Sequence, residues 1–274
     1  MDDELTTLET LARKALDGDK NAVETIARRL QPPTYALALR MLWNPHDAED
    51  ATQEILVRVV TRLALFDFRS SLRTWVYRVA ANYLLDVKRS CVERQRLTFE
   101  SFADDLAEGL SSDGPTEDEL SLLTEEVKVG CTLGMLQCLD REHRLAYVLG
   151  EILEVEAPEA AEALSIQPSA FRKRLQRARE RIEAFTRAHC GIVSESAACS
   201  CHRRVNAAVR SGRARSDDHS FAGAPSSFVE VQKLVRSIEE SRRGAALHRG
   251  IRPLGSRTDV ARAIMSAMAS DRES

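Results

Sequence analysis

The sequence predicts an all-α protein: two helical domains joined by an acidic linker, followed by a mostly helical C-terminal extension. Three observations indicate this fold class. Apolar residues recur at helical spacing, caps and breakers punctuate the chain, and strand signals are nearly absent. The chain has 274 residues, of which 43% are hydrophobic and 30% charged, a globular composition long enough for two domains or slightly more.

The first helices follow from breakers and caps. Residues 3–30 are expected to form one or two helices interrupted near Gly18, and the Pro32-Pro33 pair is expected to begin the next segment, residues 34–43. The stretch that begins at Asn44 supplies a cap for an acidic helix over residues 48–63. The next helix carries one apolar stripe at helical spacing, made of Leu72, Trp75, Val76, Val79, Tyr83 and Val87.

The linker is defined by its charge. Between Leu97 and Val127 there is no Lys or Arg, and the stretch carries ten carboxylates: Glu100, Asp104, Asp105, Glu108, Asp113, Glu117, Asp118, Glu119, Glu125 and Glu126. Such a composition predicts a flexible anionic strand. Helices are expected to resume from about Glu117 or Glu126 to Leu139, and again over residues 141–153.

A helix-turn-helix follows. Residues 157–164 form its first helix, residues 165–167 its turn, and the second helix begins at Pro168. The inner face of the second helix is apolar, and its outer face carries Ser169, Arg172, Lys173, Gln176, Arg177 and Glu180. In this arrangement the early residues of the second helix reach base edges in the major groove.

Beyond about residue 190 the pattern changes, and Cys190, Cys199, Cys201 and His202 place four soft ligands within thirteen residues. Thiolate and imidazole suit zinc or copper, although the spacing is not that of a standard zinc finger. A redox thiol switch and incidental buried cysteines are the other two interpretations. The isolated Cys91, Cys131 and Cys138 are interpreted as packing residues. A final pair of helices is expected over residues 227–247 and 258–268.

The residues from Asp47 to Arg89 carry a more specific pattern. It consists of an acidic D-A-E-D-x-x-Q-E segment, a Phe-containing loop and a T-W-x-Y-R-x-A-x-N helix. Together with the E-A-A and R-A-R motifs of the helix-turn-helix, it resembles a bacterial sigma factor of the extracytoplasmic-function (ECF) class. The resemblance implies a docking and promoter-melting domain at 1–92, a linker at 93–127, a helix-turn-helix domain at 128–189 and a regulatory extension at 190–274.

The resemblance also implies residue roles. Core RNA polymerase would bind the acidic helix through Asp47, Asp50, Gln53 and Glu54. The melted −10 element would contact Phe66, Phe68, Arg69, Ser70, Arg73, Trp75, Tyr77, Arg78 and Asn82, because an unstacked base needs aromatic surfaces and polar edges. Trp75 and Tyr83 equally suit core positions. The −35 element would contact Ser169, Arg172, Lys173, Gln176 and Arg177, and the acidic linker would thread towards the polymerase active site.

The function implied is promoter-specific initiation of transcription by core RNA polymerase, in a chain that is not itself an enzyme and needs no cofactor. Its partners would be core polymerase and promoter DNA, as duplex and as melted strand, with an anti-sigma factor as a further partner to consider. No apolar run suits a membrane span, so a cytoplasmic location is expected. Two alternatives stay open: a metal- or redox-gated helix-turn-helix regulator, which leaves the acidic helix unused, and a nucleic-acid-processing enzyme, for which no catalytic constellation is seen.

Overall fold

The structure is a computed structural model that describes residues 6–87, 97–108, 110, 117–210, 214, 232–233, 235–250 and 255–270, without the side chains of 117–121 and 267–270. Within these ranges the regular elements are all helices, which confirms the predicted fold class. None of the described helices is long and apolar enough to cross a lipid bilayer.

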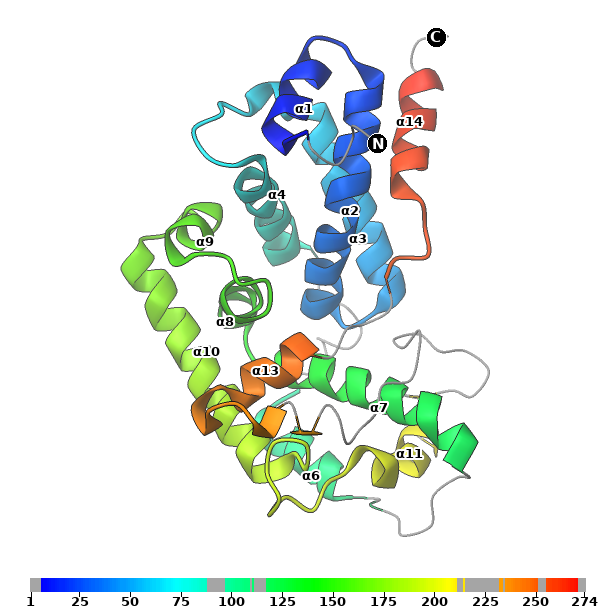
Figure 1. Ribbon diagram of the computed structural model, residues 1–274, viewed down its shortest axis with the longest axis vertical. Coiled ribbons are helices and arrows are strands. Elements are labelled where there is room, and N and C mark those ends of the chain that lie inside the picture. Colours follow the sequence, from blue (N-terminus) through cyan, green and yellow to red (C-terminus); the bar gives the residue numbers. More distant parts are fainter. Residues whose placement is uncertain are drawn as a thin grey trace.

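The N-terminal helices pack as one bundle (Figure 1). Its elements are α1 (Leu8–Leu16), α2 (Lys20–Leu42), α3 (Pro45–Thr61), the short 3-10 helix η1 (Leu63–Leu65) and α4 (Leu72–Asp86). Polar side chains at Thr7, Asp19, Asn44 and Ser71 accept hydrogen bonds from the first-turn N–H groups of the four α-helices. These caps fix where each helix begins, and the Asn44 cap was predicted from the sequence.

The Pro32-Pro33 pair does not begin a new helix, which corrects the prediction. Helix α2 runs without a break from Lys20 to Leu42 through both prolines. Each interior proline removes a backbone hydrogen bond and costs about 3 kcal/mol. Buried apolar residues on both sides of the pair, such as Leu30 and Leu37, pack into the same core, and this burial offsets the cost.

The second group of helices begins within the predicted linker and continues to the C-terminal extension. Its elements are α6 (Phe99–Ala107), α7 (Glu117–Gln137), α8 (Arg141–Tyr147), the π-helical turn η2 (Val148–Ile152), α9 (Ala157–Ala163), α10 (Pro168–His189), α11 (Cys201–Arg210), the 3-10 turn η3 (Glu240–Arg242), α13 (Arg243–Gly250) and α14 (Val260–Ser270). The helix-turn-helix is present as predicted, with α9 and α10 as its two helices.

The described part of the linker is not a flexible strand, so that expectation is wrong for residues 99–107. Thr98 and Ser101 form a capping box at the start of α6. Phe102 and Leu106 are buried, and the Phe102 ring stacks on that of Phe185 with centroids 5.6 Å apart. The acidic residues of α6 lie between these apolar positions, so the charge pattern concealed an amphipathic helix.

The C-terminal extension returns to both groups of helices. Helix α13 packs on α10 and η2, and α14, red in Figure 1, lies along α2 and α3 beside the N-terminal bundle. Within the predicted helix at 227–247, the described residues 232–233 and 235–236 are helical, the chain then turns at 237–239, and η3 and α13 follow. Phe228, Val231 and Leu234 of that prediction lie outside the described residues.

Candidate nucleic-acid interface

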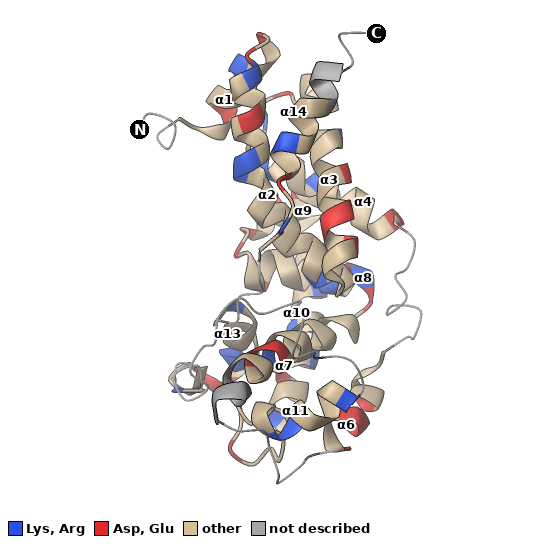
Figure 2. Cartoon of the chain, turned by 90° about the vertical axis from the view of Figure 1, so that its right-hand side faces the viewer, with Lys and Arg blue, Asp and Glu red and all other residues tan. Residues whose placement is uncertain are grey.

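Helix α3 presents the residues predicted to bind polymerase. Asp50 and Gln53 are exposed, whereas Asp47 and Glu54 are partly buried. The Glu54 carboxylate accepts a hydrogen bond of 2.9 Å from Arg58, and the Asp50 carboxylate lies 3.2 Å from the His46 ring, so two of the four groups already have a partner on their own helix. Figure 2 shows the acidic residues of α3 among mixed charges on this side of the molecule.

The loop predicted to capture a base contains an aromatic cluster. The Phe66 ring lies 4.5 Å from that of Phe68 and 5.7 Å from that of Trp75, measured between centroids. The guanidinium of Arg13 sits 4.1 Å above the Phe68 ring. Phe66 is buried in the core of the bundle in this conformation, and its predicted contact with a base stays a prediction.

The remaining −10 residues divide by exposure. Arg69, Arg73 and Asn82 are exposed, and Ser70, Trp75 and Arg78 are partly buried. Tyr77 is only 5% exposed and thus buried in this conformation, and its predicted contact with the strand stays a prediction. Helix α4 packs against α9 as well as against the N-terminal bundle, and a helix covered from two directions buries more than one stripe.

Helices α4 and α9 are joined by a polar contact between a −10 residue and the helix-turn-helix. The Arg78 guanidinium lies 3.0 Å from the Glu162 carboxylate. It also donates hydrogen bonds of 3.2 and 3.3 Å to the Glu162 backbone carbonyl. In this conformation Arg78 therefore binds the first helix of the helix-turn-helix.

The outer face of α10 is free of such contacts with other helices in the described part of the chain. Its predicted −35 residues are all exposed: Ser169, Arg172, Lys173, Gln176 and Arg177. Phe171, Ala178 and Ile182 on the opposite face are buried, as the periodicity predicted. Two other cations of this basic segment are engaged elsewhere, since Arg174 pairs with Glu142 and Arg179 with Glu151.

The extension contacts the inner end of α10 through a buried carboxylate. Glu183 accepts hydrogen bonds of 3.0 Å from the N–H of Gly244 and 3.3 Å from that of Ala245, the first turn of α13. Burial raises the pKa of Glu183, and the two N–H donors partly offset that shift. The N-terminus of α13 is thus tied to α10, the second helix of the helix-turn-helix.

The extension also contacts α3. Glu49 accepts hydrogen bonds of 2.8 Å from the Arg257 N–H and 2.9 Å from the Thr258 hydroxyl. Asp259 lies 3.4 Å from Arg28 of α2. These contacts place the start of α14 on the same helix that carries the predicted polymerase-binding residues. Sequence reasoning missed Glu49, Glu162 and Glu183, because each of these glutamates sits in a charged stretch that reads as solvent-exposed.

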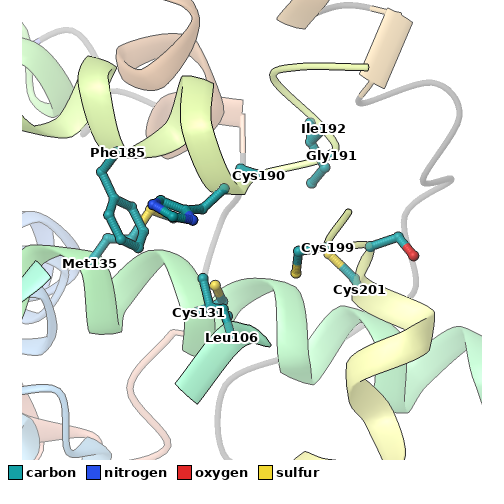
Figure 3. Close-up of a pocket in the computed structure, with 11 residues that line it drawn as sticks. Leu106, Cys131, Met135, Phe185, Cys190, Gly191, Ile192, Cys199 and Cys201 are labelled. Carbon is teal, nitrogen blue, oxygen red and sulfur yellow. The ribbon is translucent and has the colours of Figure 1, made fainter. Parts of the chain in front are cut away.

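Four cysteines lie around one small cavity (Figure 3). Cys190, Cys199 and Cys201 were predicted as a group, and Cys131 of α7 lines the same cavity. Cys131 packs against the core as predicted, but it is not isolated from the other cysteines. His202 is exposed and does not line this cavity. Among the described residues, no three His, Cys, Asp or Glu side chains are arranged to hold a metal ion as they stand. Cys91 lies outside the described residues.

Comparisons with known proteins agree with this architecture. The family model described as Sigma-70 region 2 matches residues 26–92. The ECF RNA polymerase sigma factor SigW of Bacillus subtilis is 30% identical over 169 residues, covering 60% of this chain and 88% of that protein. The RNA polymerase sigma factor CnrH of Cupriavidus metallidurans is 31% identical over 179 residues, covering 64% and 92%.

A solved structure of CnrH in complex with the cytosolic domain of CnrY is 23% identical, has a TM-score of 0.45, and covers 64% of this chain and 93% of that chain. The sequence relatives, together with the region 2 match, show that this chain belongs to the ECF RNA polymerase sigma factors. It is a transcription initiation factor that binds core RNA polymerase and promoter DNA. The interpretation as a metal- or redox-gated regulator is not favoured.

Proposed function

We propose that this sigma factor is held in a closed form by its own C-terminal extension. The observation that carries the proposal is that the extension contacts both functional halves: Glu49 on α3 through Thr258, and Glu183 on α10 through Gly244. In the same form α9 covers α4 and engages Arg78. Opening would release α4 for the melted strand and α3 for the polymerase.

The residue roles belong to this proposal. Asp50 and Gln53, with Asp47 and Glu54 beside them, would form the polymerase contact on α3. Their exposure and their position on one helix support this role. For the −35 element, the five outer residues of α10 supply cations and amide or hydroxyl groups, the chemistry that phosphates and base edges require.

The −10 contact would rest on the exposed and partly buried residues Phe68, Arg69, Ser70, Arg73, Trp75, Arg78 and Asn82. Phe66 and Tyr77 would support this surface from the core. An anti-sigma partner stays a separate prediction, since the extension already occupies α3 in cis. The domain boundaries at 92, 127 and 189 also stay predictions.

The test is transcription in vitro with purified core polymerase and a library of promoter fragments. We expect initiation from a small set of promoters, and a several-fold gain for the double variant Thr258→Ala/Asp259→Ala, which weakens α14 docking without touching α2 or α3. The matched control is Ala263→Ser at an exposed position of α14. If the double variant and the control are equally active, the closed form does not limit initiation.

A further inference from the structure

The cavity between α7, the end of α10 and the start of α11 has an unusual lining. Of the five cysteines that the structure describes, four face it: Cys131, Cys190, Cys199 and Cys201. The other lining residues are mostly apolar, namely Leu106, Met135, Phe185, His189, Gly191, Ile192 and Ser200. The cavity volume of about 20 Å³ holds one water-sized or ion-sized occupant.

The backbone around the cavity is built to bring its two cysteine segments together. The Gly191 N–H donates a 3.0 Å hydrogen bond to the Cys199 carbonyl. A Cβ at position 191 would lie 2.2 Å from that carbonyl oxygen, so only glycine permits this approach. Gln232 and Arg236 donate to the Gly191 carbonyl from the other side, at 2.9 and 2.8 Å.

The environment keeps the thiols neutral in the absence of a ligand. Burial raises the pKa of all four thiols, that of Cys199 to about 11. The positive charge of Arg204 lowers the pKa of Cys131 and Cys199, and Lys128 has the same effect on Cys201, but burial outweighs both. Both cations are themselves paired with carboxylates, Lys128 with Glu125 and Arg204 with Asp105.

We propose that Cys131, Cys190, Cys199 and Cys201 form a binding site for one thiophilic d10 cation, Zn²⁺ or Cu⁺. Sulfur ligands from a dry, mainly apolar cavity suit such ions and not Mg²⁺ or Ca²⁺. The thiols are not in coordinating positions in the closed cavity, so binding requires rotation of their side chains onto one centre. Each thiol that becomes a ligand releases one proton to solvent.

The proposed ligand set differs from the one expected from the sequence, because it contains Cys131 in place of His202. That exchange matters structurally. Cys190, Cys199 and His202 all belong to the extension and its junction with α10, whereas Cys131 lies on α7 of the helix-turn-helix domain. A cation bound to all four sulfurs would cross-link α7 to α11. Metal control of initiation rests on the proposed closed form, but metal binding itself does not.

The experiment measures metal per chain and affinity on the full-length protein, purified under reductant without chelator and titrated with Zn²⁺ and with Cu⁺ against competing chelators. We expect one ion per chain, with affinity lowered at least about tenfold in Cys131→Ser and in Cys199→Ser/Cys201→Ser. Cys138→Ser, in the turn that follows α7 and outside the cavity lining, and His202→Ala should keep wild-type affinity.

A measurement on the unmodified chain guards against variants that fail to fold. Substitution with Co²⁺ should give the intense thiolate-to-metal charge-transfer absorption of a sulfur-rich site in the wild type. Absence of that absorption, no bound metal in either titration, or wild-type affinity in Cys131→Ser would overturn the proposal. If the protein binds metal but transcription is the same with and without metal, the metal site is supported and metal control of the proposed closed form is rejected.

Discussion

Arg78 and Glu162 form an ion pair of 3.0 Å across the contact between α4 and α9, and this pair joins a predicted −10 residue to the −35 module. The arginine side chain is 36% exposed and the glutamate 45%. A pair this accessible to water contributes only about 0.2–1 kcal/mol. It therefore adds little to the packing of α4 on α9, which already holds the two helices together.

Removal of the charge on Glu162 should loosen this contact without altering Arg78. We expect Glu162→Gln to raise initiation by roughly twofold to fivefold at limiting sigma factor, the change that corresponds to about 0.5–1 kcal/mol. Glu159→Gln, an exposed change on the same helix, is the control and should have no effect. Equal rates for the two variants would show that the ion pair does not restrain opening.

The acidic helix can be tested by its affinity for core polymerase. The double variant Asp50→Ala/Gln53→Ala removes two exposed groups of α3 and should raise the Kd for core about tenfold, equivalent to about 1.4 kcal/mol. The control is Asp17→Ala, an exposed carboxylate between α1 and α2. Fluorescence anisotropy of labelled sigma factor provides the Kd. Unchanged binding would place the docking surface elsewhere.

Contacts with the −35 element can be separated into base and phosphate contacts. Substitution of a side chain that contacts a base should weaken the binding free energy by about 1–3 kcal/mol and relax the base preference at one promoter position. Substitution of a side chain that contacts a phosphate should mainly reduce the salt dependence of binding. Arg172→Ala and Lys173→Ala should each follow one of these patterns in promoter-binding titrations of the holoenzyme. Arg187→Ala lies at the far end of α10, paired with Glu240, and should follow neither.

Phe185 should be a major stability residue of the second group of helices. Its ring contacts those of Phe99, Phe102 and His189 at centroid distances of 5.2, 5.6 and 4.8 Å. Phe185→Ala should lower the free energy of unfolding by about 3–5 kcal/mol and release α6. Phe99→Ala, at a partly exposed position, should cost less. Urea denaturation followed by circular dichroism measures both values.

The stability of the α13 contact should fall in acid. His248 is buried between the Gly244 and Thr132 carbonyls, and burial lowers its pKa to about 4 although both carbonyls oppose the shift. Because the unfolded value is about 6.5, the folded chain binds fewer protons between these limits. Neutral His248 makes its full contribution to the free energy of unfolding above pH 6.5, and this contribution is lost as the pH falls towards 4.

In this pH range, His248 alone should change the free energy of unfolding by up to about 1.4 kcal/mol per pH unit. Urea unfolding at several pH values should show that His248→Asn has a flatter dependence than the wild type. The exposed variant His202→Asn should keep the wild-type slope. A wild-type slope in His248→Asn would assign the acid sensitivity to other groups.

Sequence patterns predicted the helices and the outer face of α10 well, because caps and periodicity are local signals. They failed where tertiary packing decides. Tyr77 reads as a surface residue beside the stripe of α4, yet it is buried in the core. Pro32 reads as a breaker, yet core burial carries α2 through it. Cys131 is nearly sixty residues from Cys190 in the chain, so no spacing rule could join the two.

The bond between Glu183 and the first turn of α13 also sets an order in time. Glu183 leaves the ribosome before Gly244, and at synthesis rates of about 5–20 residues per second the interval is roughly 3–12 s. During that interval α3, α4 and α10 already exist, and α13 and α14 do not. If the proposed closed form is correct, the growing chain therefore passes through a stage in which α3, α4 and α10 are not yet restrained by the extension. Only later can the extension compete with core polymerase for these helices.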